Sequence, residues 1–424
     1  MRLALNKKPF IAQSLALSVA ALMMTTTHAA TKEQQELAQL RAEVAELKAL
    51  MQQQQQVQQQ QAVQIQQVKA QPAPVKAESP LSSFKSKSGA DINLYGFVRG
   101  DANYIIEGQD DDFNKVASSD GKTKDKLRAT AKTTRLGLDF NTNVGGDNKL
   151  GGKVEVDFAG STTDSNGALR IRHAYLTYNN WLFGQTTSNF LSNHAPEMID
   201  FATNVGGGTA ARIPQVRYGF NLAPATKLFI SAEEGDSSGK NIKYSVPNLT
   251  AKLTQGFADG KGSVSARALV ENYKSADDSD TAWGLAAGVN YQVMDPLKIS
   301  ADVSYVQGNS NYLYGSNTAF YVNPVNGNIE QNEAFGVQVG GTYKFNEKLR
   351  STLAYGALFA DDGTDYATLN STANEEVYQA WINFIYSPVK PLDLGVEYIN
   401  GKRDTFAGDS YKDNRVGLMA KYSF

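Results

Sequence analysis

Cysteine is absent from the 424 residues, and only three of them are histidine. The chain can therefore form neither a disulfide nor a thiolate metal site, which fits a protein that crosses an oxidising space unfolded. His28 falls in the leader described below, and His173 and His194 lie near no nucleophile motif. The acidic runs at 110–112 and 277–278 are more typical of solvated loops than of calcium sites. The sequence thus predicts no catalytic residue, no metal site and no cofactor, and it disfavours an enzyme.

An excess of charge of one sign is also missing, because 41 Lys and Arg balance 43 Asp and Glu to a net charge of −2. This balance argues against a nucleic-acid partner. Beyond residue 24 no apolar run reaches the ~18 residues that a spanning helix needs, and the mean hydropathy is −0.39. Helical membrane spans are therefore excluded. A membrane β-barrel is not excluded, since strands that alternate apolar and polar residues average out as hydrophilic.

The first thirty residues have the pattern of a signal peptide. Arg2, Lys7 and Lys8 precede a mostly apolar run over residues 10–24, and Thr27-His-Ala-Ala30 supplies small residues for cleavage. The run is too short for a membrane anchor and ends in small residues, so we expect residues 1–30 to be removed.

Residues 31–70 follow a seven-residue period, which predicts an α-helical coiled coil. The a positions are Leu37, Val44, Met51, Gln58 and Ile65, and the d positions are Leu40, Leu47, Gln54, Gln61 and Val68. A lone helix this rich in glutamine is marginal in water, so self-association is the simplest way to stabilise it. The alternative is a disordered glutamine-rich spacer. The prolines of residues 71–91 then end the helix, and this segment is the predicted linker.

From residue 92 the period changes to two. In the last ten residues Val416, Leu418, Ala420, Tyr422 and Phe424 share one face, and polar or small residues occupy most of the other. We expect strands near 92–105, 128–142, 149–159, 168–178, 180–187, 212–221, 226–234, 249–257, 263–273, 282–293, 297–308, 333–345, 348–359, 375–387, 390–402 and 412–424. Short and long connections alternate, as in outer-membrane barrels. The sequence therefore predicts an all-β fold, a transmembrane antiparallel barrel of about sixteen strands over residues 92–424. Residues 241–246 are rejected as a further strand, because both ends of the barrel should lie in the periplasm.

Charged residues decide which face of each strand meets lipid, because one Arg or Lys there costs roughly 2–4 kcal/mol at the membrane midplane. Turning Leu169 and Ile171 outward places both Arg170 and Arg172 in the lumen. The same rule predicts outward Leu136, Leu138, Phe140, Val154, Val156, Phe158, Val216, Tyr218, Val264, Ala266, Ala268, Leu392, Leu394 and Val396. The predicted interior is charged, and a barrel of this size can hold an aqueous channel.

The connection 187–211 differs from the other long loops. It carries Leu191, Met198, Ile199 and Phe201, which an exposed loop would not favour, and three glycines at 206–208. We expect it to fold into the barrel and narrow the pore.

Arginines predicted to point inward, or to lie at a loop base, are candidate contacts for anionic solutes. They are Arg99, Arg135, Arg170, Arg172, Arg212, Arg217 and Arg267. A guanidinium binds a carboxylate bidentately, and two on one wall could hold both ends of a diacid. The alternative is that they pair with Asp101, Asp139, Glu155, Asp157 and Glu271 in the wall. In the folded loop, Glu197 and Asp200 would face this basic wall unless they are ordinary solvated carboxylates, and His194 is the third candidate residue of the constriction.

The motifs together resemble a known family, the DcaP-like trimeric porins of Gram-negative outer membranes. They are the leader, the glutamine-rich heptads, Leu94-Tyr-Gly-Phe-Val-Arg99, Arg135-Leu-Gly-Leu138, Arg172-His-Ala-Tyr175, Phe183-Gly-Gln-Thr186, Pro214-Gln-Val-Arg-Tyr218 and terminal Phe424. The resemblance implies a homotrimer of sixteen-stranded barrels, an inward third loop, and a preference for dicarboxylates and other small anions.

The resulting hypothesis is a porin of the cell outer membrane, among membrane lipid and lipopolysaccharide, with its coiled coil in the periplasm. Its expected function is a water-filled, anion-preferring channel for small negatively charged solutes. The alternatives are a non-selective general diffusion porin, and a structural or adhesive barrel tethered by the coiled coil.

Overall fold

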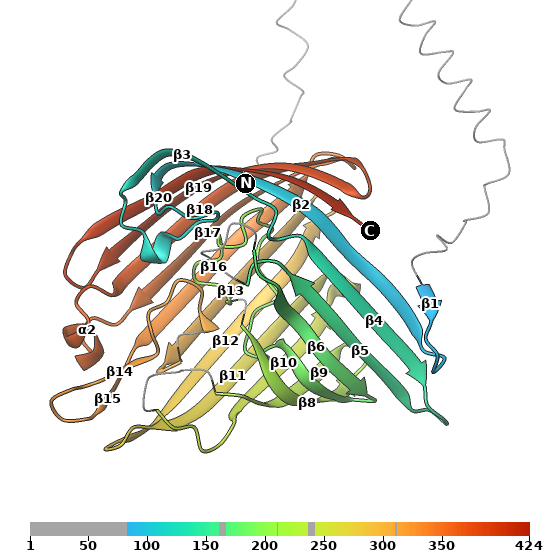
Figure 1. The fold of residues 1–424 in the computed structure, drawn as a ribbon, viewed down its shortest axis with the longest axis horizontal. Coiled ribbons are helices and arrows are strands. Elements are labelled where there is room, and N and C mark those ends of the chain that lie inside the picture. The colour runs from blue at the N-terminus through green and yellow to red at the C-terminus, as the bar shows by residue number, and fades with distance from the viewer. Residues whose placement is uncertain (1–82, 161–166, 210, 236–241, 310–311) are drawn as a thin grey trace, which may run out of the picture. The chain divides into compact units, whose positions relative to one another are not determined.

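The computed structural model describes residues 83–160, 167–209, 211–235, 242–309 and 312–424. The predicted signal peptide and coiled coil, and most of the linker, lie outside the described residues. Within them the fold is a closed antiparallel β-barrel of sixteen strands with almost no helix (Figure 1), which confirms the barrel part of the predicted fold.

The strands follow one another around the wall, each pairing with the next in sequence. They are β2 (Asp91–Gly108), β3 (Thr123–Thr130) with β4 (Arg135–Asn143), β5 (Lys149–Asp157), β6 (Arg170–Tyr178), β7 (Trp181–Thr187), β8 (Arg212–Ala223), β9 (Thr226–Glu233), β10 (Asn248–Phe257), β11 (Gly262–Lys274), β12 (Ser279–Met294), β13 (Leu297–Gln307), β16 (Glu333–Lys344), β17 (Leu349–Ala360), β18 (Asn374–Val389), β19 (Leu392–Thr405) and β20 (Ser410–Ser423). The barrel closes where β20 pairs with β2, with Val98 opposite Tyr422.

One crossing is interrupted. Residues 91–97 of β2 pair with β4, and residues 101–108 pair with β3, so β3 and β4 together make a single strand broken at 131–134. The sequence predicts one strand at 128–142, and the two pieces together supply this one crossing.

Several small elements are not predicted by the sequence. They are β1 (Ser83–Lys85), which pairs with the start of β2, the hairpin β14 (Phe320–Val322) and β15 (Ile329–Gln331), the helix α2 (Asp365–Leu369), and the 3-10 turns η1 (Val116–Ser118) and η2 (Ala258–Gly260). The rejected strand candidate contributes only one isolated bridge among its described residues, between Lys243 and Lys274.

Tight turns and long loops lie at opposite ends of the barrel. Asn179 and Asn180 make a two-residue turn in which Asn179 has φ 52°, a conformation that asparagine tolerates well. The long connections 109–122, 188–211 and 308–332 start from the other end. We refer below to the turn end and the loop end.

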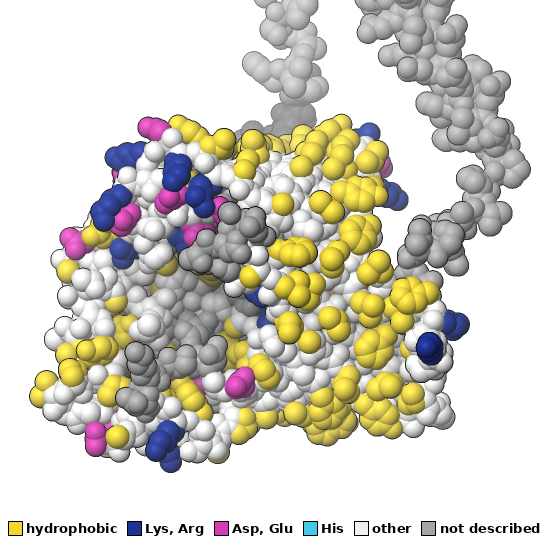
Figure 2. Space-filling model, in the orientation of Figure 1, with side chains coloured by type: hydrophobic (Ala, Val, Ile, Leu, Met, Phe, Trp, Pro, Cys, Tyr) yellow, Lys and Arg dark blue, Asp and Glu magenta, His cyan; other side chains and the backbone are white. Residues whose placement is uncertain are grey.

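Apolar side chains cover the outer wall in the view of Figure 2. Many of the side chains that point inward are polar or charged, as Arg99, Asp157 and Arg267 are. Val154 of β5 and Ile171 of β6 are exposed on the outer side. On the inner side of the same two strands, Arg172 donates hydrogen bonds to Glu155 and Asp157. The prediction of which residues on these two strands face outward and which face inward is therefore confirmed. Aromatic pairs such as Trp181–Tyr218 and Tyr343–Phe345 ring the turn end, as expected of an interfacial girdle.

The few helical segments in the described part of the chain are short. None of them is long and apolar enough to cross a membrane.

Placing a cation on the outer wall tests the orientation of the strands. We expect Val154→Arg to lower the free energy of unfolding in lipid bilayers by roughly 2–4 kcal/mol, because the guanidinium would enter hydrocarbon. The measurement is equilibrium unfolding in denaturant. The control is Thr177→Arg, since Thr177 lies opposite the inward Gly151 and its replacement should change stability little. Equal effects of the two substitutions would contradict the assigned faces.

Candidate functional site at the pore constriction

The connection 188–211 crosses the barrel interior and is anchored to the far wall. Glu397 of β19 accepts hydrogen bonds from the backbone N–H groups of Ile199 and Asp200 at 2.9 and 2.8 Å. Arg99 of β2 donates to the Ile199 carbonyl at 2.6 Å. Trp381 of β18 donates to the Glu197 carbonyl at 3.1 Å. Hydrogen bonds from three strands therefore fix the backbone of this loop, which we call the constriction loop.

Two other loops pack onto the constriction loop. In the β13–β16 connection, the Tyr314 N–H donates to the Gly207 carbonyl at 2.9 Å. In the β2–β3 connection, the Asn114 N–H donates to the Asp200 carboxylate at 2.8 Å. Gly206 has φ +72°, and a Cβ there would overlap backbone oxygens of β16 and β17. Only glycine allows the loop to approach the wall this closely.

A cavity of about 520 Å³ lies between these loops and the wall formed by β4, β6 and β8. The wall contributes four arginines, which are Arg135, Arg170, Arg172 and Arg212. We call them the arginine wall. The opposite side is formed by the β2–β3 connection, the constriction loop and Tyr314.

A β-bulge positions the arginine wall. The register between β5 and β6 shifts between Glu155 and Val156, which places both Arg172 and His173 on the inner side, where each meets a polar neighbour. Bulges re-aim side chains in this way and are frequent beside functional sites. Arg172 consequently lies beside Arg170, and both bind the same carboxylate of Asp157.

Wall carboxylates pair with the arginine wall but do not neutralise it. Asp157 accepts from Arg170 at 2.7 Å and from Arg172 at 2.8 Å. Glu155 accepts from Arg172 at 2.8 Å and lies 3.4 Å from Arg135. Arg135, Arg170 and Arg172 thus share two carboxylates, Glu155 and Asp157. Asp111 and Lys115, which also line the cavity, lie 3.7 Å apart as an ion pair and cancel.

A second cavity of about 130 Å³ adjoins the first, and the two share Arg135 and Phe201. Its charged lining residues are Arg99, Arg135, Glu197, Arg350 and Lys421. Phe201 is 43% exposed, and the Arg99 guanidinium carbon lies 4.3 Å from the centre of its ring. The shared residues mark the neck between the two cavities.

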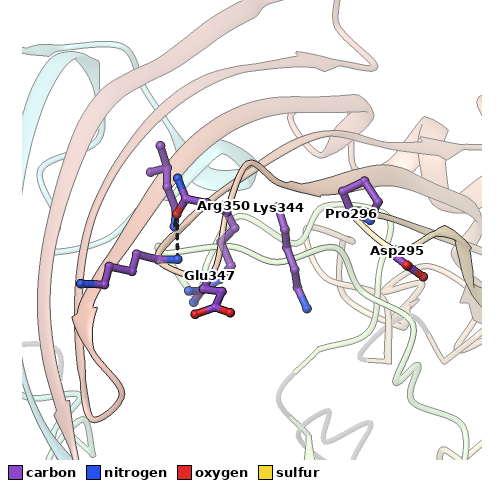
Figure 3. A pocket seen from close by; sticks show the side chains of 8 residues that line it. Asp295, Pro296, Lys344, Glu347 and Arg350 are labelled. Carbon is purple, nitrogen blue, oxygen red and sulfur yellow. Dashed lines mark hydrogen bonds between the residues drawn. The ribbon is translucent and has the colours of Figure 1, made fainter. Parts of the chain in front are cut away.

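A third cavity, of about 700 Å³, opens at the turn end between the β12–β13 and β16–β17 turns (Figure 3). It is lined by Lys344, Glu347 and Arg350 among others. Arg350 belongs to both this cavity and the second one. Each of the three cavities therefore shares at least one lining side chain with the next.

The remaining predicted site residues lie outside the 520 Å³ cavity. Arg99 and Arg267 are each 3% exposed, and they pair with Asp101 and Asp302 respectively at 2.6 Å. Arg217 donates to the backbone carbonyl of Thr187 at the base of the constriction loop. These three arginines hold the loop or the wall. Arg99 pairs with Asp101, one of the wall carboxylates named in the sequence analysis, whereas Arg267 pairs with Asp302, which was not named there.

The three predicted loop residues also differ in their surroundings. His194 is buried and lies 2.9 Å from the Ser265 hydroxyl, and burial lowers its pKa. Asp200 is 2% exposed and accepts from the N–H groups of Asn114 and Ala202. Burial raises the pKa of Asp200 to about 6. The positive charge of Arg415 lowers this pKa and offsets the effect of burial only in part. Glu197 lines the 130 Å³ cavity and binds Arg350.

Arg350 and Lys421 are functional candidates that the sequence reading missed. That reading took its arginines from the first nine strands, whereas these residues lie on β17 and β20. The alternation in 348–359 and in the last ten residues would have placed both of them inward.

Metal-ligating residues do not gather in the described part of the chain. There, no group of three or more His, Asp or Glu residues has an arrangement that could hold a metal ion.

The model of the DcaP outer membrane protein family matches residues 23–424. The chain belongs to this family. A solved outer membrane channel DcaP of Acinetobacter baumannii is 72% identical, with a TM-score of 0.78, and the match covers 81% of this chain and 100% of that one. The resemblance noted in the sequence is thus confirmed, and the protein is an outer membrane channel of the DcaP type.

More distant outer-membrane proteins share the fold alone. OmpT of Vibrio cholerae is 15% identical with a TM-score of 0.54, over 81% of this chain and 100% of that one. An anion-selective porin from Comamonas acidovorans is 13% identical with a TM-score of 0.55, over 79% of this chain and 100% of that one. No curated protein matches significantly.

The buried Asp200 makes the stability of this DcaP-family barrel depend on pH. Its folded pKa of about 6 lies above the ordinary 3.8, so folding favours the protonated form. The associated stability is fully present below about pH 3.8 and is lost as the pH rises through about 6, with a total of about 3 kcal/mol. Asp200→Asn does not titrate. It keeps one acceptor oxygen for the N–H groups of Asn114 and Ala202, which bind separate oxygens of Asp200, so its absolute stability is lowered at every pH and the comparison concerns the pH dependence alone. In thermal unfolding in detergent, the melting temperature of Asp200→Asn should therefore rise relative to that of the wild type between pH 4 and 7. Melting temperatures of the two proteins that change in parallel with pH would contradict this.

Proposed function

We propose that this channel prefers anions and conducts small negatively charged solutes, in particular dicarboxylates. The observation that supports this most is the arginine wall, four guanidiniums around one cavity in the pore, of which Arg135, Arg170 and Arg172 share two carboxylates, Glu155 and Asp157. Fixed charges that line a narrow pore select permeating ions by their field.

The geometry suits carboxylates. Guanidiniums bind carboxylates through two parallel hydrogen bonds. Arg135 and Arg170, at the two ends of the carboxylate pairings, each keep part of their side chain exposed, 20% and 41%. A solute with two carboxylates can bridge two such groups on the wall, while the existing wall carboxylates keep each contact weak enough to release it.

Two alternatives stay distinguishable from this proposal. A general diffusion porin would conduct without charge preference. A structural barrel tethered by its N-terminal segment would show no conductance in planar bilayers.

Reversal potentials in a salt gradient test the proposed selectivity. We expect anion preference for the wild type, and Arg170→Gln should lower the anion-to-cation permeability ratio by roughly two- to threefold, because one exposed cation leaves the arginine wall. The control is Lys122→Gln, which removes the same charge from a side chain 82% exposed at the loop end. Cation preference of the wild type would reject the proposal while leaving the channel in place.

We further propose that the mature chain assembles as a homotrimer through residues 31–70, in the outer membrane with lipid and lipopolysaccharide around the barrel. The supporting observation is the unbroken heptad register from Leu37 to Val68. This arrangement places the coiled coil in the periplasm, after removal of residues 1–30 and before the linker 71–91.

Deleting residues 31–70 should lower the thermal stability of the trimer while single barrels keep their conductance, because the coiled coil adds contacts between subunits without lining the pore. The measurement is the temperature at which trimers dissociate on gels. An unchanged dissociation temperature would contradict the role given to the heptads.

A further inference from the structure

The second cavity, on the turn side of the neck, carries a charge pattern that the arginine wall does not account for. We propose that Arg350 and Lys421 form a second anion-binding station there, and that Glu197 is its built-in competitor. The inference rests on the proposed anion preference, and it names Glu197 as a residue that weakens anion binding in the pore.

Cations outnumber carboxylates in the lining of the 130 Å³ cavity, and behind the lining Arg99 is paired with Asp101 and Lys421 with Asp393. Four cations line the cavity, Arg99, Arg135, Arg350 and Lys421, and among its lining residues Glu197 is the single carboxylate. The rest of the lining is apolar and comes from Phe97, Met198, Phe201, Ile385 and Met419. A small carboxylate with an apolar body matches this combination.

Glu197 occupies the position that a solute carboxylate would take on Arg350. The Arg350 Nε lies 3.1 and 2.9 Å from the two carboxylate oxygens, and Nη2 lies 2.8 Å from Oε1. This is the bidentate arrangement in which arginine recognises carboxylates. The pair is partly solvated, with the two side chains 23% and 34% exposed. Water therefore weakens it, and exchange with an incoming anion is feasible.

The surroundings hold the cations in place when Glu197 leaves. Arg350 donates to the Ser387 hydroxyl at 3.2 Å, and that hydroxyl donates to Asp393 at 2.6 Å. Lys421 lies 2.9 Å from the same Asp393 carboxylate. The station thus stays assembled without its competitor.

The backbone of Glu197 is fixed independently of its side chain. Its carbonyl accepts from Trp381 Nε1 at 3.1 Å and from Asn383 Nδ2 at 3.0 Å. Displacement of the carboxylate therefore needs only a change of side-chain rotamer and no movement of the constriction loop. By competing for Arg350, the Glu197 carboxylate shortens the time that a solute anion stays bound. Conduction requires such weak binding, because each anion must leave the site.

Current block by succinate, added separately to each side of single channels, tests the proposal. For succinate added at the turn end, we expect Glu197→Gln to bind roughly two- to fivefold tighter, because an exposed competing ion pair has been removed. Arg350→Gln and Lys421→Gln should weaken the same block. Block from the loop end should change less in all three variants.

The matched control is Glu347→Gln, which removes one negative charge from the neighbouring turn cavity (Figure 3). It should leave the turn-end affinity unchanged. If Glu197→Gln has no effect, or no more effect than Glu347→Gln, Glu197 is not a competitor and the proposal is overturned.

Failure of this inference is distinguishable from failure of the proposed function. An anion-selective wild type whose turn-end block is insensitive to both Arg350→Gln and Lys421→Gln would remove the second station alone. A wild type that prefers cations would remove both proposals. Should Arg350→Gln fail to insert into bilayers, Lys421→Gln, whose side chain is 27% exposed, carries the same test.

Discussion

The pairing of β20 with β2 is the interaction on which the rest of the structure depends. In an apolar environment every backbone N–H and C=O must be paired within the protein, so a sheet that crosses a membrane has to close on itself. Closure is completed at the chain terminus, where Gly96 and Phe424 exchange two backbone hydrogen bonds of 3.1 and 3.0 Å. Once the sheet is closed, the two faces of each strand become an outer and an inner surface.

Closure also explains the charged groups buried in the interior. Asp413 with Arg415, and Asp302 with Arg267, are almost fully buried pairs. Burial of a charge is costly unless it is paired and hydrogen-bonded. These pairs meet that condition and also bind loop backbone, as Arg415 does with the carbonyls of Gln109 and Asp111. The inner wall is therefore an anchoring surface for the loops as well as a channel lining.

The barrel could be predicted because its two signals are local. Alternation and turn residues locate strands, and an arginine in hydrocarbon is costly enough to decide which face points outward. The small elements β14, β15 and α2 could not be found in this way, since three to five residues carry no period. Their positions depend on packing against other loops.

The site could be predicted only in part, because loops decide which inward residues meet solvent. Arg99 and Arg170 are both inward arginines in alternating strands, yet Arg99 lies beneath the Ile199 carbonyl and Arg170 stays open to the cavity. The bulge that turns Arg172 and His173 to the same side has no sequence marker that we recognise. Asp200 looked like a pore carboxylate, but its side chain binds the backbone of another loop.

The absence of native cysteine allows a direct test of the central claim, that water fills the inside of the wall and lipid covers the outside. Leu176 and Thr177 are neighbours on β6 that point to opposite faces, outward beside Gly152 and inward beside Gly151. Single variants Leu176→Cys and Thr177→Cys in lipid bilayers should be treated with a membrane-impermeant anionic thiol reagent. The account predicts labelling of Thr177→Cys with a drop in current and no labelling of Leu176→Cys. Labelling of the two in the reverse pattern would contradict it.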